Sequence, residues 1–150
     1  MERALVVLNG ADGEQELVER ALRLADGVGA TVEFFAVFTP DEYEEAVETL
    51  DSIADVEQTG YDVDAAFGLV RPVIEEGIES TGADVDYELS GEVAEGTGRA
   101  DAVLGALADR DCDHVFVAGQ ERSPTGKAVF GDAVQSVLLN AAVPVTTLLN

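Results

Sequence analysis

The stretch GQERSPTGKAVFGD, residues 119–132, holds the residues of this chain best suited to binding an anion. Its glycines leave backbone N–H groups free to face a ligand, and a helix that starts near its end adds a positive dipole. Arg122 and Lys127, the only lysine, place two of the eight basic residues in one short segment. This local reversal of charge in an acidic chain predicts a site for phosphate or another anion.

A second interpretation of this stretch stays open: its basic side chains only neutralise nearby carboxylates, and its glycines only form turns. Spacing does exclude a Walker A loop, because six residues separate Gly119 from Gly126 where that loop has four. Ala128 also stands where the loop needs Ser or Thr. A Rossmann fingerprint fails too, since residues 9–13 lack the GxGxxG spacing.

Alternating strands and helices must position this stretch. Apolar or alternating runs predict strands at residues 4–8, 31–38, 85–89, 115–118 and 144–149. Apolar residues at helical spacing predict helices at about residues 17–28, 40–53, 66–78, 100–107 and 134–141. Thr39 is the expected N-cap of the second helix, and Pro72 either starts or kinks the third.

Five strands separated by helices predict an α/β fold, with one parallel flavodoxin-like sheet and helices on both faces, in a single domain over residues 1–150. Ligands of such sheets bind beyond the carboxyl ends of the strands, where the strand order reverses. The first strand ends at Asn9, Gly10 and Ala11, and the fourth ends at Gly119. A flavodoxin-like order therefore puts both ends on the rim of one crevice.

The charge of the chain bounds its partners. The 31 Asp and Glu residues against 8 Lys and Arg give a formal net charge of −23. The carboxylates are spread between apolar positions, which predicts a solvated acidic coat on an ordinary core. Such a coat repels itself in dilute buffer and is screened in molar salt, so we expect a halophilic source. The same charge argues against nucleic acid and anionic membranes as partners.

Other candidate groups carry little chemistry. His114 has no second histidine or cysteine pair beside it, so we expect a structural role and no metal site. Cys112 is the only cysteine and is predicted to be a small buried residue. Spacing identifies no nucleophile, and we expect no enzyme. The polar turn soon after the first strand argues against a signal peptide or spanning helix, so we expect a cytoplasmic protein.

Four features occur together in this chain: a first strand that ends in Asn9-Gly10-Ala11, the block DHVFVAG at residues 113–119, the glycine-rich loop, and a last helix that runs into Val143-Pro144-Val145. In these features the chain resembles the universal stress proteins, over nearly its whole length. It implies an adenine-nucleotide alpha-hydrolase-like sheet in the order 3-2-1-4-5, typically in a homodimer. The nucleotide-binding branch of that family has the pattern Gly-x2-Gly-x9-Gly-Ser/Thr after its fourth strand.

Matched to that pattern, the chain keeps some positions and changes others. Gly119 and Gly131 resemble its first and last glycines, with a loop one residue shorter between them. Arg122 stands in place of the second glycine, which Gly126 could replace slightly later. The resemblance makes these residues, with Ser123 and Lys127, the implied phosphate side of the site.

The other departures concern both ends of the nucleotide. Asn9 stands where an aspartate meets the adenine, and Ala11 replaces a serine. Asp132 stands where Ser or Thr binds the terminal phosphate, and two unit charges about 4 Å apart repel by about 4 kcal/mol at an effective dielectric near 20. Mg²⁺ or Lys127 could offset that repulsion; equally, Asp132 could serve only as the N-cap of the last helix, which needs no ligand.

Two functions stay open. The resemblance implies a regulatory protein that binds ATP or AMP, with Mg²⁺ if the ligand is ATP. The alternative is an interaction module of stressed cells that has lost its nucleotide. In both cases we expect a homodimer through the last strand, from Val145 to Leu149, because a long apolar sheet edge left open favours aggregation.

Overall fold

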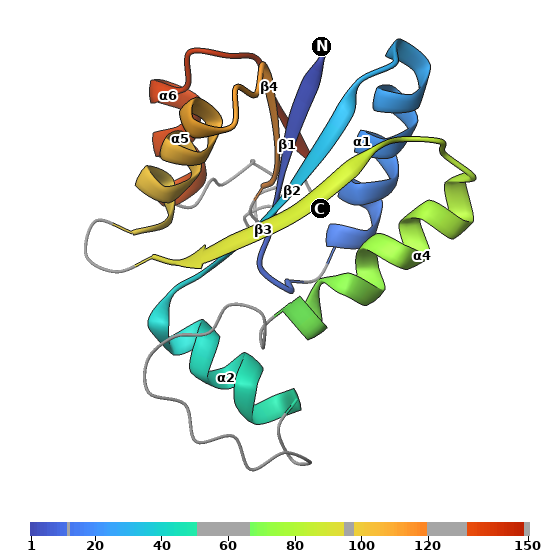
Figure 1. Cartoon of the computed structure of the whole chain (residues 1–150). Coiled ribbons are helices and arrows are strands. Elements are labelled where there is room, and N and C mark those ends of the chain that lie inside the picture. The colour runs from blue at the N-terminus through green and yellow to red at the C-terminus, as the bar shows by residue number, and fades with distance from the viewer. Residues whose placement is uncertain (12, 51–66, 95–97, 120–131, 149–150) are drawn as a thin grey trace, which may run out of the picture.

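A computed structural model describes residues 1–11, 13–50, 67–94, 98–119 and 132–148 of the chain. The strands of this part form one parallel sheet in the order β3-β2-β1-β4-β5 (Figure 1). They are β1 (Arg3–Leu8), β2 (Thr31–Phe38), β3 (Tyr87–Val93), β4 (His114–Ala118) and β5 (Val145–Leu148). The predicted fold class and strand order are confirmed.

Helices follow the strands much as the apolar spacing predicts. They are α1 (Glu14–Val28), α2 (Pro40–Leu50), α4 (Arg71–Thr81), α5 (Arg99–Asp109) and α6 (Asp132–Asn140), with a 3-10 turn η1 (Phe67–Leu69) before α4. Pro72 lies in the first turn of α4, so it starts that helix and does not kink it. The end of the predicted second helix, at Ile53, lies outside the described residues.

The edge strand β3 differs from its predicted position. It begins at Tyr87 and continues past Leu89 to Val93, whereas Val85 precedes it. Its pairing with β2 explains the shift, because the register runs without a break from Val32 opposite Tyr87 to Phe38 opposite Val93. The partner strand therefore sets the length of β3, and the alternation of its own side chains does not.

Each face of the sheet is covered by a pair of helices. Along β1, Ala4, Val6 and Leu8 pack with α1 and α4, whereas Leu5 and Val7 pack with α5 and α6. Because both faces of the strand are buried from Ala4 to Leu8, this part of its sequence is apolar throughout and does not alternate. Figure 1 shows α1 and α4 on one side of the sheet and α5 and α6 on the other.

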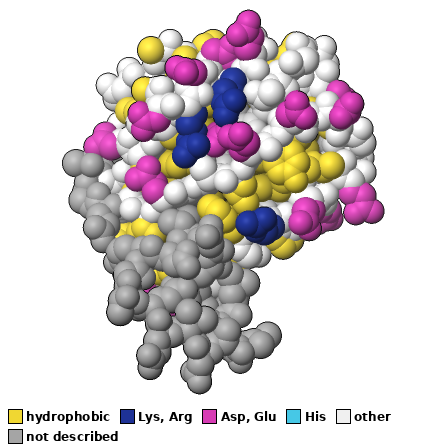
Figure 2. Space-filling model, viewed as in Figure 1, with side chains coloured by type: hydrophobic (Ala, Val, Ile, Leu, Met, Phe, Trp, Pro, Cys, Tyr) yellow, Lys and Arg dark blue, Asp and Glu magenta, His cyan; other side chains and the backbone are white. Residues whose placement is uncertain are grey.

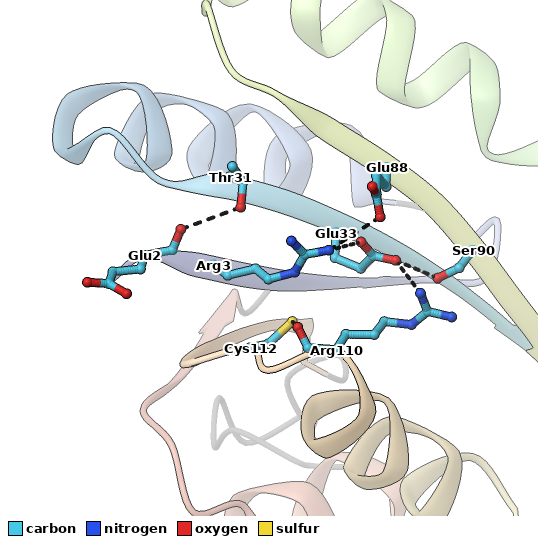
Figure 3. A network of polar contacts seen from close by, with 8 residues as sticks. All are labelled: Glu2, Arg3, Thr31, Glu33, Glu88, Ser90, Arg110 and Cys112. Carbon is cyan, nitrogen blue, oxygen red and sulfur yellow. Dashed lines mark hydrogen bonds and ion pairs between the residues drawn. The ribbon is translucent and has the colours of Figure 1, made fainter.

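One charged side chain lies inside this core. Glu33, on β2, is fully buried and accepts hydrogen bonds from Arg3 Nη2 at 2.9 Å, Arg110 Nη1 at 2.8 Å and Ser90 Oγ at 2.9 Å (Figure 3). Arg3 also reaches the exposed Glu88 at 3.3 Å. A buried carboxylate is tolerated when it is paired and fully hydrogen-bonded, as it is here. The cluster joins β1, β2, β3 and the residue after α5.

The rest of the acidic residues form the expected coat with one further exception. Figure 2 shows carboxylate side chains scattered over one face of the molecule, with few basic side chains among them. In the described part of the chain, Glu14 and Glu33 are the buried charged residues, so the prediction that the carboxylates coat the surface is wrong at these two positions. None of the helices described is long and apolar enough to cross a membrane.

Candidate functional site at the carboxyl ends of β1 and β4

The strand order reverses at β1. From this strand the chain runs through β2 to β3 on one side, and it returns to form β4 and β5 on the other. Ala4 of β1 pairs with His114 of β4, and Val6 pairs with Phe116. If this register is extended past the paired residues to the ends of the two strands, Asn9 stands opposite Gly119. The Gly119 N–H donates to the Leu148 carbonyl at 2.7 Å. Asn9 and Gly119 therefore share the rim where parallel sheets bind ligands.

The turn between β1 and α1 needs glycine at its second position. Gly10 has a φ of +84°, a backbone angle that residues other than glycine rarely adopt. A Cβ added to it would also meet Leu69 Cδ1 at 3.2 Å. Asn9 stabilises the same turn, because its Oδ1 accepts a hydrogen bond from the Ala11 N–H at 3.1 Å. The backbone of this rim is thus defined by local contacts.

A buried carboxylate fills the inner side of this turn. Glu14, in the first turn of α1, accepts hydrogen bonds from the Asn9 N–H at 2.7 Å and the Gly10 N–H at 2.8 Å. Its side chain is buried, and desolvation raises its pKa from 4.5 to about 7 although the N–H donors and the charge of Arg99 act in the opposite direction. Sequence reasoning did not identify Glu14; its one signal was an acid placed soon after the strand end.

A second carboxylate links the turn to two helices. Glu42 and Thr39 form a reciprocal cap at the start of α2: Thr39 N–H donates to Glu42 Oε1 at 2.9 Å, and Glu42 N–H donates to Thr39 Oγ1 at 3.2 Å. The predicted N-cap is therefore confirmed. Glu42 also pairs with Arg99 Nη2 at the start of α5, and it accepts a long contact of 3.5 Å from Asn9 Nδ2.

The rim opens into a pocket of about 500 Å³. It is lined by Asn9, Gly10, Ala11, Glu42, Glu45, Ala46, Glu48 and Leu69. The predicted adenine-side residues thus lie together at one pocket. Three carboxylates of α2 also line it, so the pocket is acidic and favours ligands of low negative charge.

The predicted phosphate side falls mostly outside the described residues. Arg122, Ser123, Gly126, Lys127 and Gly131 lie in residues 120–131, which the structure does not describe. Gly119 directly follows β4, and Asp132 is the first residue of α6. The phosphate half of the site stays a prediction from sequence.

The remaining candidates have structural contacts. A ring nitrogen of His114 lies 2.7 Å from Thr146 Oγ1, and the ring packs 4.8 Å from that of Phe116, so the residue links β4 to β5. Burial lowers the pKa of His114. Cys112 is buried, as predicted. Within the described part of the chain, no three His, Cys, Asp or Glu residues cluster in a way that could hold a metal ion.

Comparisons with known proteins agree with this geometry. A family model described as the universal stress protein family matches residues 1–148. A universal stress protein solved in complex with cAMP has a TM-score of 0.65 and 14% identity, over 98% of this chain and 95% of that one. One from Archaeoglobus fulgidus has a TM-score of 0.61 and 20% identity, over 98% and 97%.

A further structure from Archaeoglobus fulgidus, in complex with dAMP, has a TM-score of 0.56 and 16% identity, over 98% of this chain and 96% of that one. At these identities the structural likeness shows the fold alone. A comparison with curated protein sequences finds no match.

Proposed function

Because the chain belongs to the universal stress protein family, we propose that it is a regulatory protein without catalytic activity that binds an adenine nucleotide between the ends of β1 and β4. The observation that carries this proposal is the shared rim of Asn9 and Gly119 at the point where strand order reverses. Two structural neighbours with the same fold were solved with cAMP and dAMP. We assign the base to the β1 side and the phosphate to the loop after β4.

The charge of the pocket limits which nucleotides are favoured as ligands. Glu42, Glu45 and Glu48 line it, and Asp132 is the first residue of α6. Each carboxylate repels phosphate, and a triphosphate meets more of this repulsion than a monophosphate. AMP or a cyclic monophosphate is therefore the favoured ligand, and ATP requires Mg²⁺. The buried free thiol of Cys112 suits a reducing compartment, and we place this function in the cytoplasm.

Mass spectrometry of the denatured protein, purified in molar KCl, tests this function directly. We expect adenine nucleotide to be released, and we expect AMP and cAMP to raise the Tm more than ATP without Mg²⁺. Arg122→Ala and Lys127→Ala together should weaken binding. GMP serves as the control for base selectivity. A protein that carries no nucleotide and whose Tm responds to none of these ligands would contradict the proposal.

One observation favours a second function, an interaction module that binds no nucleotide. The groups on the β1 side already have partners inside the protein: Asn9 contacts Ala11 N–H and Glu42, and Glu14 holds two N–H groups of the turn. A rim satisfied by its own side chains gains less from a ligand. The same Tm measurements separate the two functions, because AMP should raise the Tm of the protein only if the protein binds nucleotide.

We also propose that the protein is a homodimer paired through β5. The residues of this edge strand, VTTL, carry no charge, whereas the opposite edge strand, β3, contains the exposed residues Glu88 and Glu92. Charged side chains on an edge strand oppose pairing, and an uncharged edge invites it. The partner is a second copy of this chain.

Sedimentation in molar KCl tests the dimer. We expect Thr147→Lys to shift the protein to a monomer, because it puts a charge on the paired edge. Leu24→Lys adds the same charge on the half-exposed outer face of α1 and should leave the dimer intact. A wild-type protein that sediments as a monomer at micromolar concentration excludes pairing through β5.

A further inference from the structure

The turn that carries the β1 side of the site is held by the side chains of Glu14 and Asn9. Glu14 is 3% exposed, and its two carboxylate oxygens accept the Asn9 N–H at 2.7 Å and the Gly10 N–H at 2.8 Å. Asn9 in turn holds the Ala11 N–H through its own Oδ1. The three residues that line the pocket from β1 are therefore placed, directly or through Asn9, by a single carboxylate.

We propose that Glu14 is a positioning residue of the nucleotide site, and that its protonation loosens the β1–α1 turn and weakens nucleotide binding. This inference rests on the proposed nucleotide-binding function. It assigns to Glu14 no contact with the ligand. The residue acts through the backbone of Asn9 and Gly10.

The chemistry of the carboxyl group supports this role. An ionised carboxylate accepts both N–H bonds strongly, whereas a protonated carboxyl has one hydroxyl donor and weaker acceptors. Glu14 makes this change in the neutral range, since burial raises its pKa to about 7. The charged group that faces it from another element is Arg99 at the start of α5, which pairs with Glu42 of α2. Within its own turn the N–H groups of Asn9, Gly10 and Ala11 face it.

Charge repulsion alone predicts the opposite pH dependence. An ionised Glu14 repels phosphate, so its protonation would then strengthen binding. In about 1 M salt the Debye length falls to about 3 Å, which screens the exposed carboxylates of the pocket, whereas the buried charge of Glu14 is screened less and direct hydrogen bonds stay in place. The sign of the pH dependence therefore separates the two mechanisms.

An NMR titration of the protein without a ligand tests the state of the turn directly. The amide resonances of Asn9 and Gly10 should titrate between about pH 5.5 and about pH 8.5 with a midpoint near the pKa of about 7. In Glu14→Gln this titration should vanish, because the amide side chain does not ionise. Glu16→Gln, in the same helical turn but exposed beside Arg20, should keep it.

Affinity is measured over the same pH range with cAMP, whose phosphodiester keeps one charge throughout. Wild type and Glu16→Gln should lose affinity at least about fivefold on acidification. Glu14→Gln should show a flat profile. Glu14→Asp keeps the charge on a shorter side chain that cannot reach both N–H groups, so it too should lose the wild-type profile.

The outcomes separate this inference from the function on which it rests. Affinity that rises on acidification, or a profile that is the same in wild type and Glu14→Gln, overturns the positioning role. If neither cAMP nor AMP binds at any pH, the proposed function fails. The NMR titration then tests the role of Glu14 in the turn by itself. Asn9 and Gly10 amide resonances that do not change with pH overturn that role.

Discussion

At the scale of residues, two buried carboxylates set this chain apart from an ordinary acidic protein. Glu33 lies within the sheet, opposite Leu5 of β1, whereas Glu14 lies beyond the carboxyl end of β1. Glu33 is neutralised by two arginines, whereas Glu14 has backbone donors and only the more remote charge of Arg99. This difference in partners predicts different responses to mutation and to pH.

Replacing Glu33 by glutamine should lower the free energy of unfolding by about 2 to 3 kcal/mol. The change removes both ion pairs and leaves Arg3 and Arg110 without their buried partner, although the partial exposure of both arginines moderates the loss. Urea unfolding in molar KCl measures it. Glu88→Gln removes an exposed partner of the same Arg3 and should cost less than about 0.5 kcal/mol. Equal losses in the two variants would contradict a special role for the buried carboxylate.

Glu14 should make stability depend on pH in the opposite direction to a paired carboxylate. Its pKa in the folded protein is raised from 4.5 to about 7, so its contribution is complete below about 4.5 and is lost as pH rises through 7. The free energy of unfolding of wild type, measured relative to Glu14→Gln, should fall on the order of 3 kcal/mol between about pH 4.5 and about pH 8. Parallel pH curves for the two proteins would show that Glu14 ionises normally.

At the scale of elements, close packing of α1 against α4 positions the helices on one face of the sheet. Gly77 in α4 is buried, and a Cβ added to it would lie 2.6 Å from Val18 Cγ1 in α1. Val18 is fully buried and β-branched, so its side chain has little freedom to move away. The glycine thus allows the two helices to approach each other.

Gly77→Ala should destabilise the protein by about 1 to 3 kcal/mol despite the better helix propensity of alanine. Gly105→Ala is the matched control, because Gly105 lies inside α5 and nothing comes within 4 Å of its added Cβ. That variant should gain about 0.5 to 1 kcal/mol. Thermal and urea unfolding measure both changes. A double variant, Gly77→Ala with Val18→Ala, should recover the part of the loss that is due to overlap.

At the scale of the whole molecule, the formal charge of −23 dominates. The basic side chains in the described ion pairs are few, and carboxylates are scattered over the face in Figure 2. Self-repulsion of this coat opposes the compact state and is relieved by salt. We therefore propose that the protein is adapted to high salt.

The free energy of unfolding should rise steadily with KCl and level off near about 1 M, where the Debye length reaches about 3 Å. Urea titrations at a series of KCl concentrations measure this dependence. Sorbitol at matched osmolarity is the control, because it stabilises proteins without screening charge. A stability that responds equally to KCl and sorbitol would count against charge repulsion as the cause.

The sequence alone determined the fold class, the rim and most of the elements, because these depend on patterns that are local in the chain; the bounds of β3, which its pairing with β2 sets, are the exception. Apolar runs marked the strands, Thr39 marked a helix start, and Asn9 and Gly119 followed two strands that end side by side. The resemblance to the universal stress proteins supplied the strand order, which the sheet confirms.

Only the tertiary structure decided which charged residues are buried and what they contact. Glu33 stands in β2 among apolar residues, and its partners Arg3 and Arg110 lie 30 and 77 positions away in the chain. Glu14 looks like any acid in a first helical turn until the fold covers it. Burial depends on neighbours that are distant in sequence, and the spacing of apolar residues along the chain does not reveal which residues these are. The same covering that hides Glu14 raises its pKa, and so determines how the turn responds to pH.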